Sequence, residues 1–492
     1  MSIQMRMEFK LEKETRDPSS WKWVEASVWT ERMLAALGNG VKGGKWYSLV
    51  DKVYNPRTLR AAWKKVAANR GAAGVDKISI KRFRSNAQFY LEELEKDLRS
   101  GAFQPSPVRR VNIPKDGKKI RPLGIPTVKD RIVQTALKMV LEPIFENEFL
   151  TLSYGFRPGR GCKDALRQVD RLLKEGYTWV LDADVKSYFD TIPHNLLMDR
   201  IREKISDGNI LNLIRLFLKQ EIMEDMKRWN PISGTPQGAV LSPLLSNVYL
   251  HQLDFILHQN GYKMIRYADD WVVLCRSFEE AQAVLSLTQS WIDQNGLQLS
   301  PEKTHIGNSL EIDHGFEFLG YRFEGGCRYV RSKSLKKFKD KIRSKTRRTR
   351  GDSIDKIISD LNPSIKGWFE YFKHAHHHTF NSLDGLIRRR LRAVLRKQKK
   401  RPGSGRTGRD HRQWPNAFFA ERGWRANPDE ETTDWRAVCG RTACTVRRAG
   451  RAPALPDPYH LIGISQIKNP TSLCMRNGVQ NINICSPFVS GW

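Results

Sequence analysis

The chain has 492 residues, which allows about three domains, and 40% of them are hydrophobic, enough to form real cores. Its 84 Lys and Arg exceed its 53 Asp and Glu by 31 charges, an excess that a polyanion such as nucleic acid explains best. A membrane partner is disfavoured, because the basic residues are not confined to one amphipathic helix and no apolar run approaches the ~20 residues that span a bilayer. The mixed-charge N-terminus does not resemble a secretory signal, and seven scattered cysteines favour thiols in a reducing compartment, so we expect a cytoplasmic protein without a membrane partner.

The first two thirds of the chain carry alternating helix and strand signals. After a mixed leader over residues 1–50, helices are predicted from Pro56 to Ala68 and over residues 89–98. Residues 105–114 alternate as a strand, and residues 115–118 are predicted to turn into a second strand. A helix over residues 128–150, interrupted near Pro143, comes next, and mixed signals continue to about Phe323. The pattern indicates an α+β region.

The chain changes character beyond Arg331. Residues 331–400 are predicted to be helical throughout, with little strand signal and dense basic charge. A flexible break follows at residues 402–405, and from about Trp424 the chain is rich in Pro, Cys and Arg without clear periodicity.

Carboxylates interrupt two apolar runs of strand character, one at Asp184 and the other at Asp269 and Asp270. Adjacent charges destabilise a strand, so Asp269 and Asp270 are predicted at the tip of a tight hairpin. An Asp-Asp pair alone is most often a solvated turn. With Asp184 beside the tip, however, the three acids repel one another unless divalent cations lie between them. Two Mg²⁺ ions about 3.5–4 Å apart are what in-line phosphoryl transfer uses.

Polar and aromatic residues elsewhere could serve the same chemistry. Lys115 and Arg121 flank the predicted turn, where both could reach a polyphosphate. Gln237 lies in a Gly-rich loop that enters a helix, and it could donate to a sugar or base. Phe189 follows Asp184 by five residues, where its ring would leave no room for a ribose 2′-hydroxyl. Taken singly, the two cations are usually solvated and a phenylalanine is usually a core residue.

The segment Tyr267-Ala268-Asp269-Asp270 looks like the YxDD box of reverse transcriptases, with a small residue, Ala268, at its variable position. The whole series of motifs resembles the bacterial group II intron-encoded reverse transcriptase/maturase family, from about residue 50 to residue 423. Further stretches similar to that family's motifs, in the same order, are residues 69–76, 113–115 with 121–126, 153–160, 299–304 and 316–321.

The resemblance implies an α+β right-hand polymerase fold with fingers and palm over residues 51–330. An α-helical thumb and maturase domain, often called domain X, would occupy residues 331–423, and residues 424–492 would form a C-terminal extension whose fold the sequence does not specify. It also implies site residues: Asp184, Asp269 and Asp270 as catalytic ligands of two Mg²⁺ ions, with Mn²⁺ as a substitute. Contacts to the dNTP would come from Lys115, Arg121 and Gln237, with Phe189 as the sugar gate. Candidates for the primer grip and for the proton donor to pyrophosphate are Lys303, Phe318, Leu319 and Gly320.

The helical region carries basic runs that are too dense for an ordinary solvated helix face. An RNA backbone would explain them, because folded RNA is recognised mostly through its shape and its phosphates. The predicted RNA-binding residues are Lys336, Lys337, Arg347, Arg348, Arg350, Arg388, Arg389, Arg390 and Arg392.

Two other clusters invite a metal-site interpretation that the sequence does not favour. Residues 374–378 contain four histidines, but adjacent histidines on a loop are usually solvated. Cys439 and Cys444, with Cys474 and Cys485 far downstream, fit no standard zinc spacing, and an H-N-H signature is absent. We therefore expect no endonuclease domain, as in the shorter members of the family.

The sequence thus predicts a bacterial RNA-directed DNA polymerase that uses an RNA template, a DNA primer or target, and dNTPs. As a maturase it would bind its own group II intron RNA, assisting splicing and retrohoming. One alternative is a retron-like or defence reverse transcriptase, against which the basic region after Arg331 speaks. The other is an RNA-binding splicing factor with a dead polymerase, against which the intact aspartates speak. The oligomeric state is left open.

Overall fold

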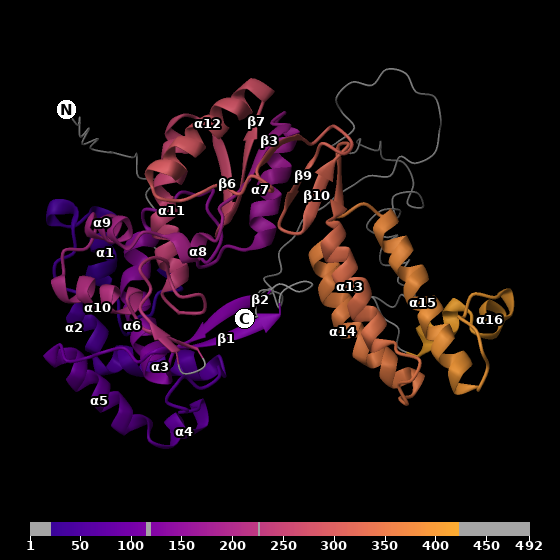
Figure 1. Ribbon diagram of the computed structural model, residues 1–492, viewed down its shortest axis with the longest axis horizontal. Coiled ribbons are helices and arrows are strands. Elements are labelled where there is room, and N and C mark those ends of the chain that lie inside the picture. The colour runs from indigo at the N-terminus through magenta and orange to yellow at the C-terminus, as the bar shows by residue number, and fades with distance from the viewer. Residues whose placement is uncertain (1–20, 115–119, 225–226, 423–492) are drawn as a thin grey trace. The chain divides into compact units, whose positions relative to one another are not determined.

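The computed structural model describes residues 21–114, 120–224 and 227–422 (Figure 1). The chain forms two compact units. Of the described residues, one unit holds those within 21–161, 183–271 and 284–302, and the other holds those within 162–182, 272–283 and 303–422. Lys115 and the four cysteines weighed as zinc ligands lie outside the described residues. No helix among the described residues has both the length and the apolar character needed to cross a bilayer.

The first unit is rich in helices, and the helices predicted from Pro56 and over residues 89–98 are both present. The side chain of Asn55 caps the former by accepting a hydrogen bond from the Arg57 amide at 2.9 Å, and Pro56 occupies the first turn, where its missing N–H costs nothing. The helices of this unit are α1 Glu31–Asn39, η2 Lys42–Gly44 (a 3₁₀ helix), α2 Val50–Tyr54, α3 Pro56–Ala68, α4 Ile80–Ser85, α5 Ala87–Ser100, α6 Val128–Glu146, α8 Tyr188–Thr191, α9 His194–Arg202, α10 Gly208–Leu218 and α11 Ser242–Gln259.

Helix α6 is predicted correctly except for its break. Pro143 lies inside the helix, which continues to Glu146, so the interruption expected near Pro143 is wrong. Proline cannot donate to the carbonyl four residues earlier, which here belongs to Met139. The buried indole of Trp29 donates to the Met139 carbonyl instead, at 3.0 Å. A partner from 110 positions away thus satisfies the acceptor that the proline leaves open.

The predicted hairpin around residue 115 is part of a four-stranded sheet of order β2-β1-β4-β5. Strands β1 (Val108–Pro114) and β2 (Ile120–Ile125) are antiparallel, with Ile113 opposite Arg121. Strand β4 (Ile222–Glu224) runs parallel to β1, and β5 (Lys227–Trp229) pairs with β4. The register fixes Arg121 near the tip of the hairpin.

A second four-stranded sheet has the order β6-β7-β3-β8. Its strands are β6 Lys263–Tyr267, β7 Asp270–Cys275, β3 Trp179–Asp184 and β8 His305–Asn308. Only Ala268 and Asp269 separate β6 from β7, and Ala268 has a φ of 61°. The tight hairpin expected at this position is therefore present, with Asp269 in the turn and Asp270 opening β7.

The second unit contains a small antiparallel sheet and a group of helices. The sheet joins β9 (Phe316–Phe318), β10 (Tyr321–Glu324) and β11 (Cys327–Val330). Helices α13 (Ser332–Lys345), α14 (Ile354–Phe372) and α15 (His378–Gln398) lie side by side (Figure 1). Between α13 and α14 the rings of Phe338 and Trp368 stack, with their centroids 4.3 Å apart. The helical prediction for residues 331–400 is confirmed as these three helices. The remaining helices are α7 Cys162–Lys174, α16 Gly408–Gln413 and α17 Asn416–Glu421, with α12 Phe278–Gln294 contributing residues to both units.

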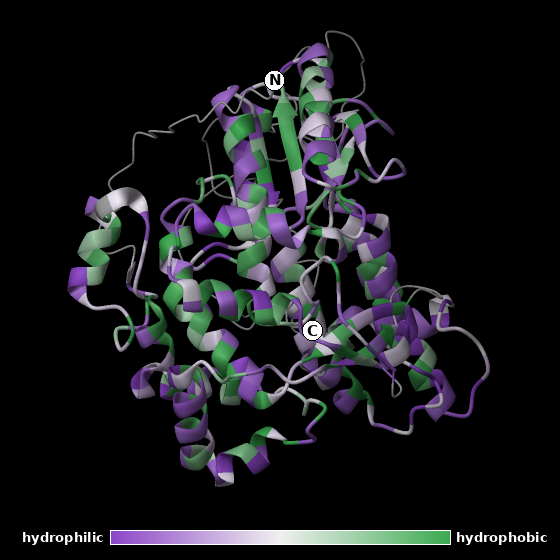
Figure 2. Ribbon diagram, turned by 60° about the vertical axis from the view of Figure 1, so that its left-hand side comes forward, coloured by the Kyte–Doolittle hydropathy of each residue, from purple (hydrophilic) through white to green (hydrophobic). Residues whose placement is uncertain are grey.

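Hydrophobic and hydrophilic residues are mixed along the helices of the protein (Figure 2), as expected of segments that bury one face and expose the other. In α14 the buried positions recur at helical spacing, at Ile357, Ile358, Leu361, Ile365 and Trp368. The apolar residues whose spacing predicts the helix are therefore also the residues that pack in the core.

Candidate functional site

A buried arginine holds the hairpin turn that carries Asp269. The guanidinium of Arg266 is fully buried and donates to both carboxylate oxygens of Asp254, at 2.7 and 2.6 Å. Its Nη1 donates to Asn247 Oδ1 at 2.7 Å and to the Ala268 carbonyl at 3.0 Å. Burial opposes the charge, but the ion pair with Asp254 outweighs it and holds the pKa of Arg266 above its ordinary value. A buried charged group that donates four hydrogen bonds thus holds the turn.

The segment 152–155 supports the same turn from its side. The Tyr154 amide donates to the Arg266 carbonyl at 2.8 Å, and the Gly155 carbonyl accepts from Asn247 Nδ2 at 2.8 Å. A Cβ on Gly155 would lie 2.1 Å from the Ala268 nitrogen, so this position admits only glycine. The motif at residues 153–160 therefore has a structural task, which is to line the turn of the acidic hairpin.

The three predicted catalytic acids lie at strand ends. Asp184 is the last residue of β3 and is half-buried. Asp269, in the turn, and Asp270, the first residue of β7, are exposed, and β3 and β7 are neighbours in one sheet. Helix α8 begins four residues after Asp184, and its Tyr188 hydroxyl donates to the Ser246 carbonyl at 2.8 Å. Burial, and further the charge of Asp269, raise the pKa of Tyr188. Asp269 therefore lies within electrostatic reach of the helix that follows Asp184.

Two of the residues predicted to bind the nucleotide, Arg121 and Gln237, form a hydrogen-bonded chain with Asp190. Arg121 Nε donates to Gln237 Oε1 at 3.1 Å, and Gln237 Nε2 donates to the two carboxylate oxygens of Asp190 at 3.3 and 3.2 Å. Partial burial lowers the pKa of Arg121, while the charges of Asp269 and Asp190 act in the opposite direction. Burial also raises the pKa of Asp190. Arg121 is thus within reach of both the acidic turn and Asp190.

The loop that carries Gln237 is packed against Phe189 and strand β2. The Thr235 amide donates to the Phe189 carbonyl at 2.7 Å, and the Gly124 amide donates to the Gln237 carbonyl at 2.7 Å. Gly234 has a φ of +85°, and a Cβ there would meet the Phe189 carbonyl at 2.7 Å. Phe189 itself is half-buried. The backbone contacts bring together Arg121, Phe189 and Gln237, which lie far apart in the sequence.

The donor chemistry of the three acids fits divalent cations that prefer oxygen ligands. Carboxylates are hard ligands, and exposed Asp269 and Asp270 leave room for water and phosphate oxygens to complete a coordination shell. Among the described residues, the group of three ligands with all atoms within 4.8 Å of one another is a different one, His376 to His378. The three carboxylates are not drawn together to that degree.

The other residues predicted to act near the primer lie in the second unit. Lys303 is exposed just before β8. Phe318 is buried, whereas Leu319 and Gly320 form a turn with positive φ values of 47° and 83°. The Tyr371 hydroxyl donates to the Leu319 carbonyl at 2.8 Å, which fixes the turn to α14. The main chain of this turn, rather than the Phe318 ring, is the part that a ligand could touch.

The predicted RNA-binding residues fall into two groups. Lys336, Lys337, Arg347 and Arg348 are exposed. Arg388 and Arg392 are buried. Arg388 pairs with buried Asp384 one turn earlier on the same helix, and Arg392 donates to the Trp414 carbonyl at 2.9 Å. A buried guanidinium held by its own domain cannot meet a phosphate without unfolding its surroundings, so the prediction of surface contacts by these two residues needs correction.

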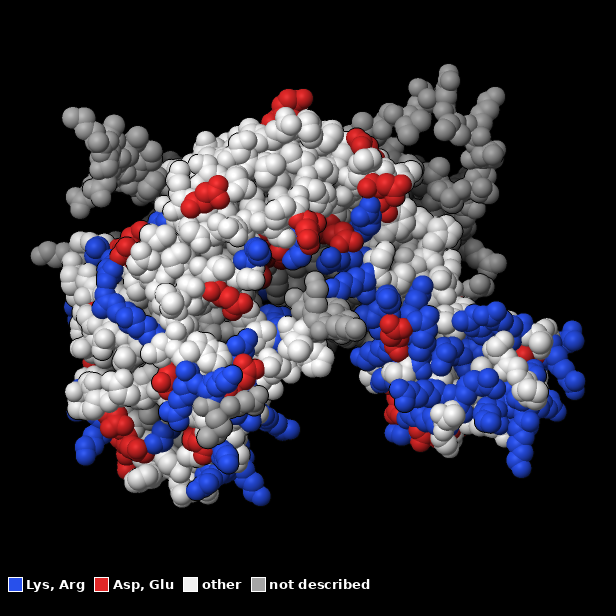
Figure 3. All heavy atoms as spheres, in the orientation of Figure 1, with Lys and Arg blue, Asp and Glu red and all other residues white. Residues whose placement is uncertain are grey.

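The remaining three arginines of that set are half-buried. Arg350 forms ion pairs with Asp352 and Asp360, and Arg390 donates to the Thr346 carbonyl at 2.8 Å, near the end of α13. Arg389 is half-buried on α15. Figure 3 shows Lys and Arg side chains gathered densely over the region of α13 to α16 on the visible face. The helical region therefore has a cationic surface, but fewer of the predicted arginines are exposed on it than the sequence suggests.

Sequence reasoning missed Arg266, Asp254, Asn247 and Asp190. Arg266 precedes the YxDD-like box within an apolar strand, and a charged residue at a position expected to be buried was a usable signal. The other three carry no local signal, because only the fold brings them to the turn and to Gln237.

Two family models match the chain. Residues 113–323 match "Reverse transcriptase (RNA-dependent DNA polymerase)", and residues 335–414 match "Group II intron, maturase-specific domain". Protein YkfC of Escherichia coli is 34% identical over 315 residues, which is 56% of this chain and 82% of YkfC. The group II intron-encoded protein LtrA of Lactococcus lactis is 42% identical over 177 residues, which is 36% of this chain and 29% of LtrA.

The chain thus aligns with most of YkfC but with less than a third of LtrA. Among solved structures, it resembles a chain of a partial Cas6-RT-Cas1–Cas2 complex with a TM-score of 0.32 and 25% identity, covering 50% of this chain and 41% of that one. A likeness at that score carries no argument about the fold.

Proposed function

This chain belongs to the family of group II intron-encoded reverse transcriptases and maturases, an RNA-directed DNA polymerase joined to a maturase domain, and we propose that one site around the Ala268–Asp269 turn performs its DNA synthesis. The observation that carries this proposal is the chain of contacts Arg121–Gln237–Asp190 lying within electrostatic reach of Asp269. It joins groups suited to a nucleotide with acids suited to cations.

We propose that the sheet β6-β7-β3-β8 is the palm, that β1 and β2 belong to the fingers, and that α13 to α15 form the thumb and maturase domain. In this arrangement Asp184, Asp269 and Asp270 would hold two Mg²⁺ ions, with Mn²⁺ as a substitute. Such ions supply electrostatic stabilisation of the attacking and leaving oxygens when bound. The structure's own contribution is a turn fixed by Arg266, so that Asp269 and Asp270 are positioned before substrate arrives.

The nucleotide would be held by residues on both sides of the acids. Arg121 presents a guanidinium to the triphosphate, and Lys115, outside the described residues, is proposed as its partner on the other side of the hairpin. Gln237 would exchange its hydrogen bond with Arg121 or Asp190 for one to the nucleotide. Phe189, fixed by its carbonyl to the Gln237 loop, would exclude a ribose 2′-hydroxyl. Lys303 is proposed as proton donor to pyrophosphate, and the Leu319–Gly320 main chain as primer grip.

Synthesis then consists of attack by a primer 3′-hydroxyl on the α-phosphate of a dNTP, with pyrophosphate leaving. Positioning and electrostatic preorganisation would supply most of the acceleration. The maturase would add binding energy to folded intron RNA through exposed Lys336, Lys337, Arg347 and Arg348, while Arg388 and Arg392 hold the domain together. We further propose that the same protein supports retrohoming, with intron RNA as template and target DNA as primer.

The test is primer extension on an RNA template with dNTPs and Mg²⁺. Asp269→Asn should abolish extension, because it removes a carboxylate without changing the shape of the side chain. Asp313→Asn is the matched control, since Asp313 is an exposed turn residue with a φ of 67°, a conformation that Asn also tolerates. Extension by Asp269→Asn at the wild-type rate would refute the site. A folded wild type that binds intron RNA but never extends a primer would instead favour a splicing factor with a dead polymerase.

A further inference from the structure

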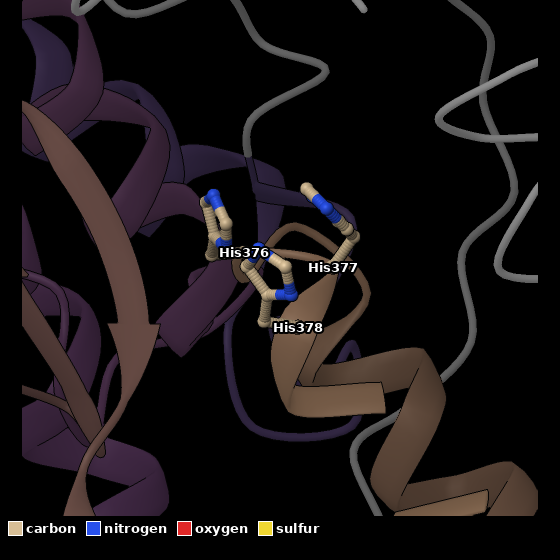
Figure 4. Close-up of side chains that lie close together, drawn as sticks. All are labelled: His376, His377 and His378. Atoms are coloured by element: carbon tan, nitrogen blue, oxygen red, sulfur yellow. The ribbon is translucent and has the colours of Figure 1, made fainter. Parts of the chain in front are cut away.

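Three consecutive histidines come together at the junction of α14 and α15, far along the chain from the acidic turn (Figure 4). The ring centroids are 4.4 Å apart for His376 and His377, 4.3 Å for His377 and His378, and 5.0 Å for His376 and His378. One ligating nitrogen of each lies within 4.8 Å of the others. Successive residues of a helix do not face one another, so this gathering requires the turn before the helix.

The main chain of that turn is held by hydrogen bonds. The His376 amide donates to the Arg328 carbonyl at 2.7 Å, and the Ala375 amide donates to the Phe372 carbonyl at 2.8 Å. The carbonyls of His376 and His377 accept from the first amides of α15, those of Thr379 and Phe380, at 3.1 and 3.0 Å. Ala375 and Phe380 are buried. The three rings therefore start from a backbone that hydrogen bonds hold in place.

We propose that His376, His377 and His378 form a binding site for one divalent transition-metal ion of the Zn²⁺, Ni²⁺ or Cu²⁺ class. Imidazole nitrogens suit these metals, whereas Mg²⁺ prefers oxygen. Around a tetrahedral zinc the ligating nitrogens lie about 3.4 Å apart, so nitrogens that now lie within 4.8 Å of one another would have to move closer on binding. Three imidazoles leave one coordination position for water or another ligand.

The electrostatic surroundings set a limit on this site. Arg328, Lys373, Lys163 and Arg167 carry positive charge near His374, which opposes a cation. Arg328 is paired with Asp170 at 2.8 Å, and Lys373 with Glu370 at 3.2 Å, so both charges are partly compensated. A metal bound here would join the turn to the first residue of α15 and stabilise the junction of α14 and α15.

The test uses the full-length chain, without a histidine tag, stripped of metal and kept in excess Mg²⁺ so that oxygen sites are saturated. Co²⁺ is titrated while its visible absorption is recorded, and Zn²⁺ is then added to displace it. The triple variant His376→Gln/His377→Gln/His378→Gln is compared with a control that removes three scattered, exposed histidines, His258→Gln/His314→Gln/His411→Gln.

The wild type and the control should each bind one equivalent of Co²⁺ more than the triple variant. Zn²⁺ should also raise the midpoint temperature of unfolding of these two proteins by more than it raises that of the triple variant. Equal stoichiometry in all three proteins would overturn the proposal. If the triple variant does not fold, the single variant His377→Gln at an exposed position replaces it, with an expected loss of affinity of about tenfold or more for one lost ligand. Unchanged affinity in a folded His377→Gln would equally overturn it. Because extension on an RNA template does not require this site, the outcome is independent of the polymerase test.

Discussion

The buried pair of Arg266 and Asp254 allows stability and positioning to be separated by mutation. Replacing Asp254 with Leu leaves the Arg266 guanidinium buried without its carboxylate, because Arg266 is fully buried and Asp254 is 5% exposed. Breaking such a pair on one side typically costs about 3–5 kcal/mol. Whole domains are stable by only about 5–15 kcal/mol, so the single variant should lose a large part of its stability.

The double variant Asp254→Leu/Arg266→Met should behave differently. It removes both charges together and substitutes apolar side chains, which is often neutral for stability, so most of the loss should be recovered. The Ala268 carbonyl, however, loses the hydrogen bond that Arg266 donates at 3.0 Å. We therefore expect a folded protein whose turn is poorly positioned and whose kcat for primer extension falls by about tenfold or more, the equivalent of 1.4 kcal/mol or more in the transition state.

The measurements are urea denaturation midpoints and steady-state primer extension on one RNA template. The control pair is Asp340 and Arg343, an exposed ion pair at 2.5 Å whose disruption by Asp340→Leu should cost no more than about 1 kcal/mol. Two results would refute the reasoning: a double variant that is as unstable as the sum of its single variants, or a stable double variant with wild-type kcat.

Three more outcomes are expected. Phe189→Ala should raise incorporation of ribonucleotides relative to deoxyribonucleotides by about tenfold or more, measured with rNTP and dNTP in separate extensions, and an unchanged ratio would remove Phe189 from the sugar site. Burial raises the pKa of Asp130 from 3.8 to about 6, so the stability that protonated Asp130 contributes should be present below about pH 4 and lost as the pH rises through about 6. The free energy of unfolding of the wild type should therefore fall by roughly 2–3 kcal/mol between these pH values relative to that of Asp130→Asn. If the free energies of the two proteins change in parallel with pH, the pKa of Asp130 is not raised. Replacing Lys336, Lys337, Arg347 and Arg348 with Ala should weaken binding of intron RNA and reduce its salt dependence, with circular dichroism unchanged, whereas Arg388→Ala should destabilise the helical domain by about 3–5 kcal/mol. Equal stability of these two variants would mean that Arg388 is not a structural residue.

Much of the secondary structure could be predicted from local sequence patterns. The spacing of apolar residues predicts the helices at residues 56–68 and 331–400, and turn-forming residues predict the hairpin at Ala268–Asp269. Both signals depend only on neighbours in the sequence. The break expected at Pro143 is wrong for the complementary reason. The local penalty of a proline is offset by Trp29, whose indole reaches Met139 from a distant part of the chain. A rule about one residue and its own turn cannot include that partner.

The candidate site shows the same division. The sequence predicts roles for Asp184, Asp269, Asp270, Arg121 and Gln237, because their side-chain chemistry and motif order suit nucleotidyl transfer. It does not single out Asp190 or Asp254, because only the fold brings Asp190 to Gln237 and Asp254 to Arg266. Composition alone suggested that the arginines of α15 contact RNA. Arg388 and Arg392 are buried, however, and are held by contacts within their own domain.

The sequence by itself determined the family, the kind of reaction and the chemical identity of the groups that could perform it, because these depend on residue types and their order. Only the tertiary structure decided which charges face solvent, which hold the hairpin turn in place, and that three neighbouring histidines converge. Those properties depend on distances between side chains and on their removal from water, and both are set by contacts between residues far apart in the chain.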